Sequence, residues 1–253
     1  MKISQSVFLK DYISVDDHGQ RSFGGSQTWF PLTEGKNLKN LHMGACGLIG
    51  ASDFCLFFAR KNRQFSRSMP EAIEKDAEDA IPKSEYLDMV LRSSRLSYPI
   101  FPKVGSFSFE FSHFVNNYLR SIGSDDRIHY LLPNTKNTRH ELIRKQLEAG
   151  YPVPLIIGQR LLNPLSKRGV HFYQFKDNVP IIIHGNVHRH FVNITGIYIS
   201  EDVRMPLFYE ISSWGRKYYI KAADLDDYIG TISAPWISSV FILNSVREKT
   251  EET

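Results

Sequence analysis

The feature that most constrains the fold of this chain is a change of hydrophobic pattern near Gly150. Before this glycine, apolar residues recur at helical spacing in several segments. After it, short runs rich in Val, Ile, Phe and Tyr alternate with polar residues, as in half-buried antiparallel strands. Helices followed by strands predict an α+β fold, with a helical lobe packed on a mostly antiparallel sheet.

The expected helices differ in how they are buried. Residues 46–61 carry apolar side chains around most of the helical circumference, which predicts a helix enclosed in the core. A short helix is expected within 70–81, and amphipathic or Gly-terminated helices are expected elsewhere. These last helices span residues 84–96, 108–123, ending at Gly123, and 138–150, ending at Gly150.

The expected strands all follow Gly150. A hairpin is predicted within 205–220, with Gly215 and Arg216 as its turn residues. The β-type runs cover residues 151–158, 170–175, 178–185, 188–200, 205–215, 216–220 and 237–244. The chain is therefore expected to be one domain, residues 1–253, with a helical lobe at about 40–150 and a β lobe at about 151–245.

Composition argues against several classes of function. The 253 residues carry a net charge of +4, but Lys and Arg are scattered among Asp and Glu without a dense basic block, so no nucleic-acid partner is expected. The first residues lack the apolar core of a signal peptide, and no segment reaches about 18 uncharged apolar residues. We therefore expect a cytoplasmic protein with no membrane partner. Two cysteines are too few for a disulfide framework.

Cys46 is the candidate nucleophile. It begins the predicted buried helix, where unpaired N–H groups and the helix dipole favour a thiolate and lower the pKa of the thiol. Gly44 and Ala45 are small and are expected to leave it accessible. The alternative is an ordinary buried thiol, which is common for cysteine. Cys55, nine residues later at about 100° per residue, faces the other side of the helix and is assigned to the core.

A nucleophilic thiol needs a base, and three histidines of the same parity, His184, His188 and His190, lie in one β-type region. On a continuous strand they would share a face. His190 begins the longest apolar strand and is the preferred base, whereas His184 and His188 are expected in loops. Two alternatives remain open: a hydrogen-bonded structural histidine, and a metal site built from the three histidines, with or without Cys46.

The base in turn needs a polar group to orient it. Glu210 and Ser212 alternate onto the same face of the strand that precedes Trp214, and either could reach a histidine on a neighbouring strand. The alternative is that Trp214 is a core anchor and that the serines of this strand are polar residues at a sheet edge.

Together these segments resemble the papain-like cysteine peptidase superfamily, nearest the bacterial branch of double-glycine leader peptidases and their uncharacterised relatives. The likeness rests on a cysteine that opens a buried helix, a His-Phe-Val-Asn-Ile-Thr-Gly strand 144 residues later, and Ser-Ser-Trp-Gly-Arg-Lys-Tyr-Tyr-Ile. The stretch Ile-Arg-Lys-Gln-Leu-Glu-Ala-Gly-Tyr-Pro-Val-Pro also fits. The likeness covers roughly residues 23–225 and implies a single papain-like domain.

The resemblance implies roles for five residues. Cys46 would be the nucleophile and His190 the general base. Asn40 stands six residues before the cysteine, where papain-like enzymes carry the Gln of the oxyanion hole. Ser212 replaces their orienting Asn, with Glu210 as a second candidate. The expected activity is hydrolysis or acyl transfer on an amide or thioester, with a peptide or acyl substrate and no metal or cofactor. The alternative, favoured by Ser212, is a non-catalytic binding or regulatory module.

Overall fold

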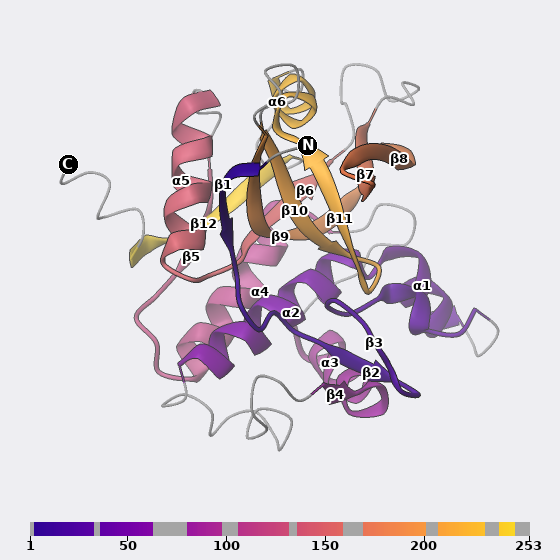
Figure 1. Ribbon diagram of the computed structural model, residues 1–253. Helices are drawn as coiled ribbons and strands as arrows, with labels where there is room; N and C mark the ends of the chain where they lie inside the picture. The colour runs from indigo at the N-terminus through magenta and orange to yellow at the C-terminus, as the bar shows by residue number, and fades with distance from the viewer. Residues whose placement is uncertain are drawn as a thin grey trace.

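The computed structural model describes residues 3–32, 36–62, 80–97, 106–131, 136–158, 169–200, 207–230 and 238–245. Helices and strands alternate in the first half, and strands dominate the second (Figure 1). In chain order the elements are β1 (Ile3–Phe8), β2 (Val15–Asp17), β3 (Gln20–Arg21), the 3-10 helix η1 (Gln27–Trp29), α1 (Lys36–Gly44), α2 (Cys46–Lys61), β4 (Ile81–Pro82), α3 (Lys83–Ser97), α4 (Ser108–Ser121), β5 (Ile128–Tyr130), α5 (Lys136–Glu148), β6 (Val153–Ile157), β7 (Val170–Lys176), β8 (Val179–Val187), β9 (His190–Ser200), β10 (Leu207–Ser213), β11 (Arg216–Lys221), α6 (Ala222–Gly230) and β12 (Ser239–Leu243).

A large antiparallel sheet organises the molecule. Its strands follow the order β5-β12-β6-β9-β10-β11-β7-β8, and β1 adds to the far half of β9. The eleven-residue strand β9 is central, because it pairs with β6, β10 and β1 along its length. A small second sheet joins β3, β2 and β4. The prediction of a mixed helix and sheet fold with a mostly antiparallel sheet is confirmed.

Helix α2 packs between the large sheet and two other helices. It packs against β9 and β6 on one side and against α3 and α4 on the other, and in Figure 1 it crosses beneath the strands. Every side chain from Cys46 to Ala59 is buried, which confirms the predicted core helix. Helices α4 and α5 end just before Gly123 and Gly150, whose φ angles of +75° and +78° stop a helix as predicted. In the described part of the chain, no single helix has both the length and the apolar composition needed to cross a bilayer.

The histidine-rich segment is not one continuous strand. His184 lies in β8, so its expected place in a loop is wrong, and His190 starts β9 after a bend. Asn186, near the end of β8, and Arg189, between β8 and β9, have φ angles of +56° and +53°, which turn the chain there. Strand β8 pairs with β7 at one end of the sheet, whereas β9 is central. His184, His188 and His190 therefore do not share a strand face.

The predicted hairpin of β10 and β11 exists, but its turn residues are Trp214 and Gly215 rather than Gly215 and Arg216. Ser213 pairs with Arg216, and both turn residues have positive φ, +49° and +71°. Positive φ at both central positions suits the tight turns that match the twist of a hairpin. The short helix expected within 70–81 falls largely outside the described residues.

Candidate active site

Cys46 and His190, 144 residues apart in sequence, line one small cavity where α2 and β9 begin. The thiol of Cys46 donates a hydrogen bond to the carbonyl oxygen of Arg189 at 3.9 Å, and the N–H of Phe191 also bonds to the sulfur. The sulfur thus contacts the backbone immediately before and immediately after His190. The cavity that the two residues share has a volume of about 20 Å³.

His190 is held in a fixed orientation. Its Nε2 lies 2.7 Å from the hydroxyl oxygen of Ser213, and its ring stacks on Trp214 with centroids 4.3 Å apart and planes inclined by 22°. A neutral imidazole that donates its Nε2–H to Ser213 leaves Nδ1 as a proton acceptor. No hydrogen bond to Nδ1 exists within the described part of the chain. This nitrogen could therefore accept a proton, although among the described residues no hydrogen bond joins it to the thiol of Cys46.

The turn residue Trp214 supports this orientation at a local cost. A bulky side chain at positive φ is strained, by about 1–3 kcal/mol, and persists only where surrounding contacts determine it. Here the indole is packed on the ring of His190 and makes an edge contact with His184 at 5.0 Å. The hairpin turn therefore places a rigid aromatic plane against the candidate base.

Burial sets the charge state of the pair. It raises the pKa of the Cys46 thiol, although N–H groups of Phe191, Gly47 and Cys46 itself lower it. Burial also lowers the pKa of His190 to about 3, with a further contribution from His184. Thiol and imidazole are both neutral near pH 7. The expectation of an accessible thiol with a lowered pKa is wrong: Cys46 is only 8% exposed, because α2 begins inside the core.

Neither orienting residue suggested by the sequence forms a hydrogen bond with the imidazole among the described residues. Ser212 donates its hydroxyl to the carbonyl oxygen of Phe23 at 2.8 Å. The carboxylate of Glu210 accepts a hydrogen bond from Thr195 at 2.9 Å and forms an ion pair with Lys217 at 3.0 Å.

The register of the sheet explains why Ser213 is the partner. Ser212 pairs with Asn193, so these two side chains share a face of the sheet. His190 precedes Asn193 by three residues and points to the opposite face, as does Ser213. Ser213, one residue beyond the predicted position, thereby reaches the base. Catalytic roles for Ser212 and Glu210 stay predictions without a supporting contact to His190.

Two amide side chains line the cavity around Cys46, those of Gln27 and Asn193, and the amide of Asn193 already donates to Tyr12 and Gly50. Asn40 is half-buried on α1 and does not line the cavity around Cys46, whereas Gln27 does. Gln27 donates one Nε2–H to the carbonyl oxygen of His42 at 3.1 Å, and its second N–H has no partner among the described residues. Helix α1 separates Gln27 from Cys46, so a search six residues before the cysteine misses it. The Gly24-Gly25-x-Gln27 stretch is the sequence signal that could have found it.

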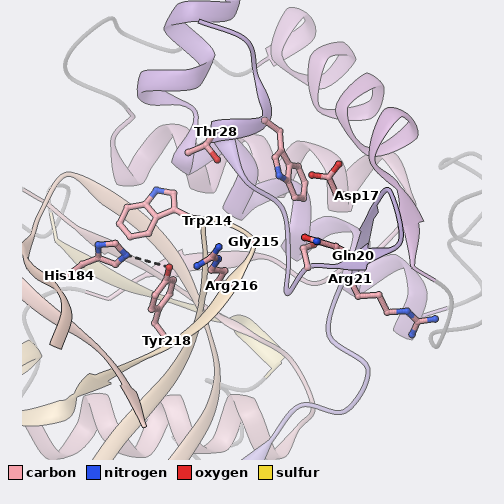
Figure 2. A pocket seen from close by; sticks show the side chains of 11 residues that line it. Asp17, Gln20, Arg21, Thr28, His184, Trp214, Gly215, Arg216 and Tyr218 are labelled. Carbon is pink, nitrogen blue, oxygen red and sulfur yellow. Dashed lines mark hydrogen bonds between the residues drawn. The ribbon is translucent and has the colours of Figure 1, made fainter. Parts of the chain in front are cut away.

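A larger cleft, of about 630 Å³, adjoins the site at Trp214 (Figure 2). Trp214 lines both the cleft and the small cavity of Cys46. In Figure 2 the residues of the β2–β3 hairpin face those of β8 and of the β10–β11 hairpin across an open space. The lining residues are Asp17, Gln20, Arg21, Ser22, Thr28, Trp29, His184, Trp214, Gly215, Arg216 and Tyr218.

The histidines do not converge as metal ligands. Within the described ranges, no three His, Cys, Asp or Glu side chains are grouped closely enough to hold a metal ion. His184 lies 3.4 Å from the hydroxyl of Tyr218, and Nδ1 of His188 lies 3.0 Å from the carbonyl oxygen of Asn186. The arrangement gives no support to the metal-site alternative.

Comparison with known proteins adds no family assignment. No protein-family model matches the chain. A search of curated proteins found no match. The geometry therefore carries the functional argument alone.

Proposed function

We propose that this chain is a cysteine hydrolase or acyl transferase with a papain-like arrangement, which acts on an amide or thioester through an acyl-enzyme on Cys46. The observation that carries the proposal is the contact of the Cys46 sulfur with the backbone on both sides of His190. A helix that opens on a buried cysteine and packs on a central antiparallel strand that opens on a histidine fits the papain-like resemblance of the sequence.

In the first step, Nδ1 of His190 accepts the thiol proton while the sulfur of Cys46 attacks the carbonyl carbon of the substrate. The new S–C bond forms as the carbonyl π electrons move onto oxygen. Gln27 Nε2–H and the backbone N–H of Cys46 are the groups that would stabilise this oxyanion. Collapse of the intermediate expels an amine or thiol, which takes the proton from His190.

In the second step, water or an acceptor amine loses a proton to His190 and attacks the thioester carbonyl carbon. Collapse breaks the S–C bond, and the thiolate of Cys46 recovers its proton from the imidazole. Because both groups start neutral, proton transfer accompanies attack and no thiolate–imidazolium pair exists beforehand. Ser213 and Trp214 hold the imidazole ring in one orientation through both steps.

The substrate class that we propose is a peptide or another acyl compound. The cleft beside Trp214 has room for several groups next to the scissile bond, and its mixed aromatic and polar lining suits a peptide. Trp214 connects this cleft to the candidate pair.

A second function, a non-catalytic binding module, is favoured by one observation. The cavity beside Cys46 is about 20 Å³, which is near the space needed for one water molecule. In this alternative the large cleft binds a ligand and the buried thiol is structural.

Trapping with electrophilic probes tests the choice. Peptide and acyl probes with a reactive carbonyl would be incubated with the native chain and with the Cys46→Ala and His190→Ala variants, followed by mass spectrometry of digested protein. The proposal predicts a covalent adduct on Cys46, none on Cys55, and loss of the adduct in both variants. A chain that binds the probes without forming any adduct would instead support the binding module.

A further inference from the structure

Residues 23–27, here termed the strap, lie between the turn of the β10–β11 hairpin and helix α2. Phe23 donates its N–H to the carbonyl oxygen of Gly215, and Gly215 donates its own to that of Gly25, both at 2.9 Å. Gly24 donates to the carbonyl oxygen of Ile13 at 2.7 Å. The strap is thus tied to the turn that carries Trp214, and it ends at Gln27, which lines the same small cavity as Cys46.

Asp53 is the buried side chain that anchors the strap to α2. Both of its carboxylate oxygens accept the N–H of Gly25, at 3.0 and 3.3 Å, and Tyr86 donates its hydroxyl at 2.7 Å. Tyr12 is a third donor. Asp53 is 2% exposed, and its partners are uncharged N–H and O–H groups. Burying a carboxyl without a cation is costly, so a chain that keeps one needs these donors.

Asp53 and Cys46 belong to one face of α2. They are seven residues apart, close to two full turns, and both line the small cavity with Gln27. Burial raises the pKa of Asp53 to about 7, while the N–H of Gly25 and the hydroxyls of Tyr86 and Tyr12 lower it.

The strap reaches Asp53 only because it is made of glycine at two positions. A Cβ atom at Gly24 would lie 2.6 Å from Oδ2 of Asp53 and 2.3 Å from the hydroxyl oxygen of Ser212. A Cβ atom at Gly25 would lie 2.0 Å from the hydroxyl oxygen of Tyr86. Such distances are far inside van der Waals contact, so the backbone approaches the carboxyl as closely as this sequence allows.

We propose that Asp53 is a positioning residue for the oxyanion-stabilising group: by holding the N–H of Gly25, it fixes the strap so that Gln27 stays beside Cys46. This inference rests on the proposed function, and it deepens it by assigning a residue that does not touch the substrate. If Asp53 acts through Gln27, its effect on acylation vanishes once the Gln27 amide is removed. A role in general stability would instead act independently of Gln27.

A double-mutant cycle tests this coupling. The rate at which an activated acyl probe forms the Cys46 adduct would be measured for wild type, Asp53→Asn, Gln27→Ala and the double variant. Gln27→Ala is expected to slow acylation by about 100-fold, in the range of one lost oxyanion donor. Asp53→Asn is expected to slow it by about 10-fold, and the double variant should be no slower than Gln27→Ala. A double variant that acylates about 10-fold more slowly than Gln27→Ala would show that the two effects are independent, and it would overturn the proposal.

Hydrogen exchange separates this inference from the proposed function. In Asp53→Asn, amide exchange in the strap should accelerate at least about tenfold while that of β12 and α5 is unchanged. Asp125→Asn, at an exposed loop position, is the matched control and should leave both unchanged. Unaltered strap exchange would refute the role of Asp53, whether or not Cys46 is acylated. If Asp53→Asn fails to fold, Tyr86→Phe, which removes one donor, should loosen the strap more mildly, and unaltered exchange there would count equally against it.

Discussion

Replacing Gly25 with alanine tests the packing that brings the strap into the site. The added Cβ atom would lie 2.0, 2.3 and 2.6 Å from three atoms of the Tyr86 side chain, Oη, Cζ and Cε1. Tyr86 is 1% exposed, so its ring is enclosed in the core and cannot swing out into solvent. The backbone of Gly25 lies outside the left-handed region, so the clash alone penalises the substitution.

The magnitude follows from two contributions. Overpacking a filled core costs about 1–3 kcal/mol. Displacement of the strap also weakens the hydrogen bond from Gly25 to Asp53. At pH 8, where a carboxyl with a pKa of about 7 is mostly ionised, such a bond to a charged group contributes about 1.5–3 kcal/mol. The free energy of unfolding should therefore fall by about 3–5 kcal/mol. With a urea m-value of about 3 kcal/mol/M, the unfolding midpoint should fall by about 1–1.7 M.

Gly50→Ala is the matched control. A Cβ atom there would have its nearest neighbours at 3.8–4.0 Å, which is ordinary contact, and alanine favours a helix over glycine by about 0.5–1 kcal/mol. Urea unfolding followed by circular dichroism should show Gly50→Ala at or above the wild-type midpoint. A Gly25→Ala midpoint equal to that of Gly50→Ala would refute the packing of the strap described above.

Two further predictions concern side-chain hydrogen bonds. Ser213→Ala removes the hydrogen-bond partner of His190 Nε2 and should slow formation of the Cys46 adduct by about 10-fold. The free energy of unfolding should fall by only about 1–3 kcal/mol. An unchanged rate of adduct formation would exclude Ser213 as the orienting group. Burial of Asp226 raises the pKa of its carboxyl. The hydrogen bonds from His140 and Arg139 lower this pKa by more than burial raises it, so the net pKa lies below its ordinary value. The stability it provides is complete above the unfolded pKa of about 3.9 and is lost as pH falls through the folded value. In Asp226→Asn, the urea unfolding midpoint should therefore fall less steeply as the pH is lowered from about 5 to 2. A variant whose midpoint falls as steeply as that of the wild type would contradict this role of Asp226.

The sequence predicted those elements whose patterns are local. Residues 46–61 were recognisable as a core helix because apolar side chains surround it, and α2 has these bounds. Gly123 and Gly150 marked helix ends because positive φ favours glycine. Strand β1 was missed, because what defines it is pairing with β9, almost two hundred residues away.

The sequence predicts those parts of the candidate site in which the residue type alone carries the chemistry. It is less informative where the pairing of distant strands decides which side chains face one another. Cys46 and His190 were chosen from their positions at the start of a helix and of a strand, and they line one cavity. The sequence does not distinguish Ser213 from Ser212, because the face that meets His190 depends on the pairing of Ser212 with Asn193. It does not indicate the burial of Cys46 either, because tertiary packing covers the first turn of α2.

The most direct test of the account is the alkylation rate of each cysteine in the native chain. Iodoacetamide at pH 7, quenched over time and read by mass spectrometry, should label Cys46 at least about tenfold faster than Cys55. Burial raises the pKa of both thiols, but backbone N–H groups lower that of Cys46, whereas the pKa of Cys55 is raised well above the ordinary value by burial alone. His190→Ala should slow labelling at Cys46 towards that of Cys55, because the proton acceptor is lost. Equal rates at the two thiols, or a Cys46 rate that does not respond to His190→Ala, would contradict the account.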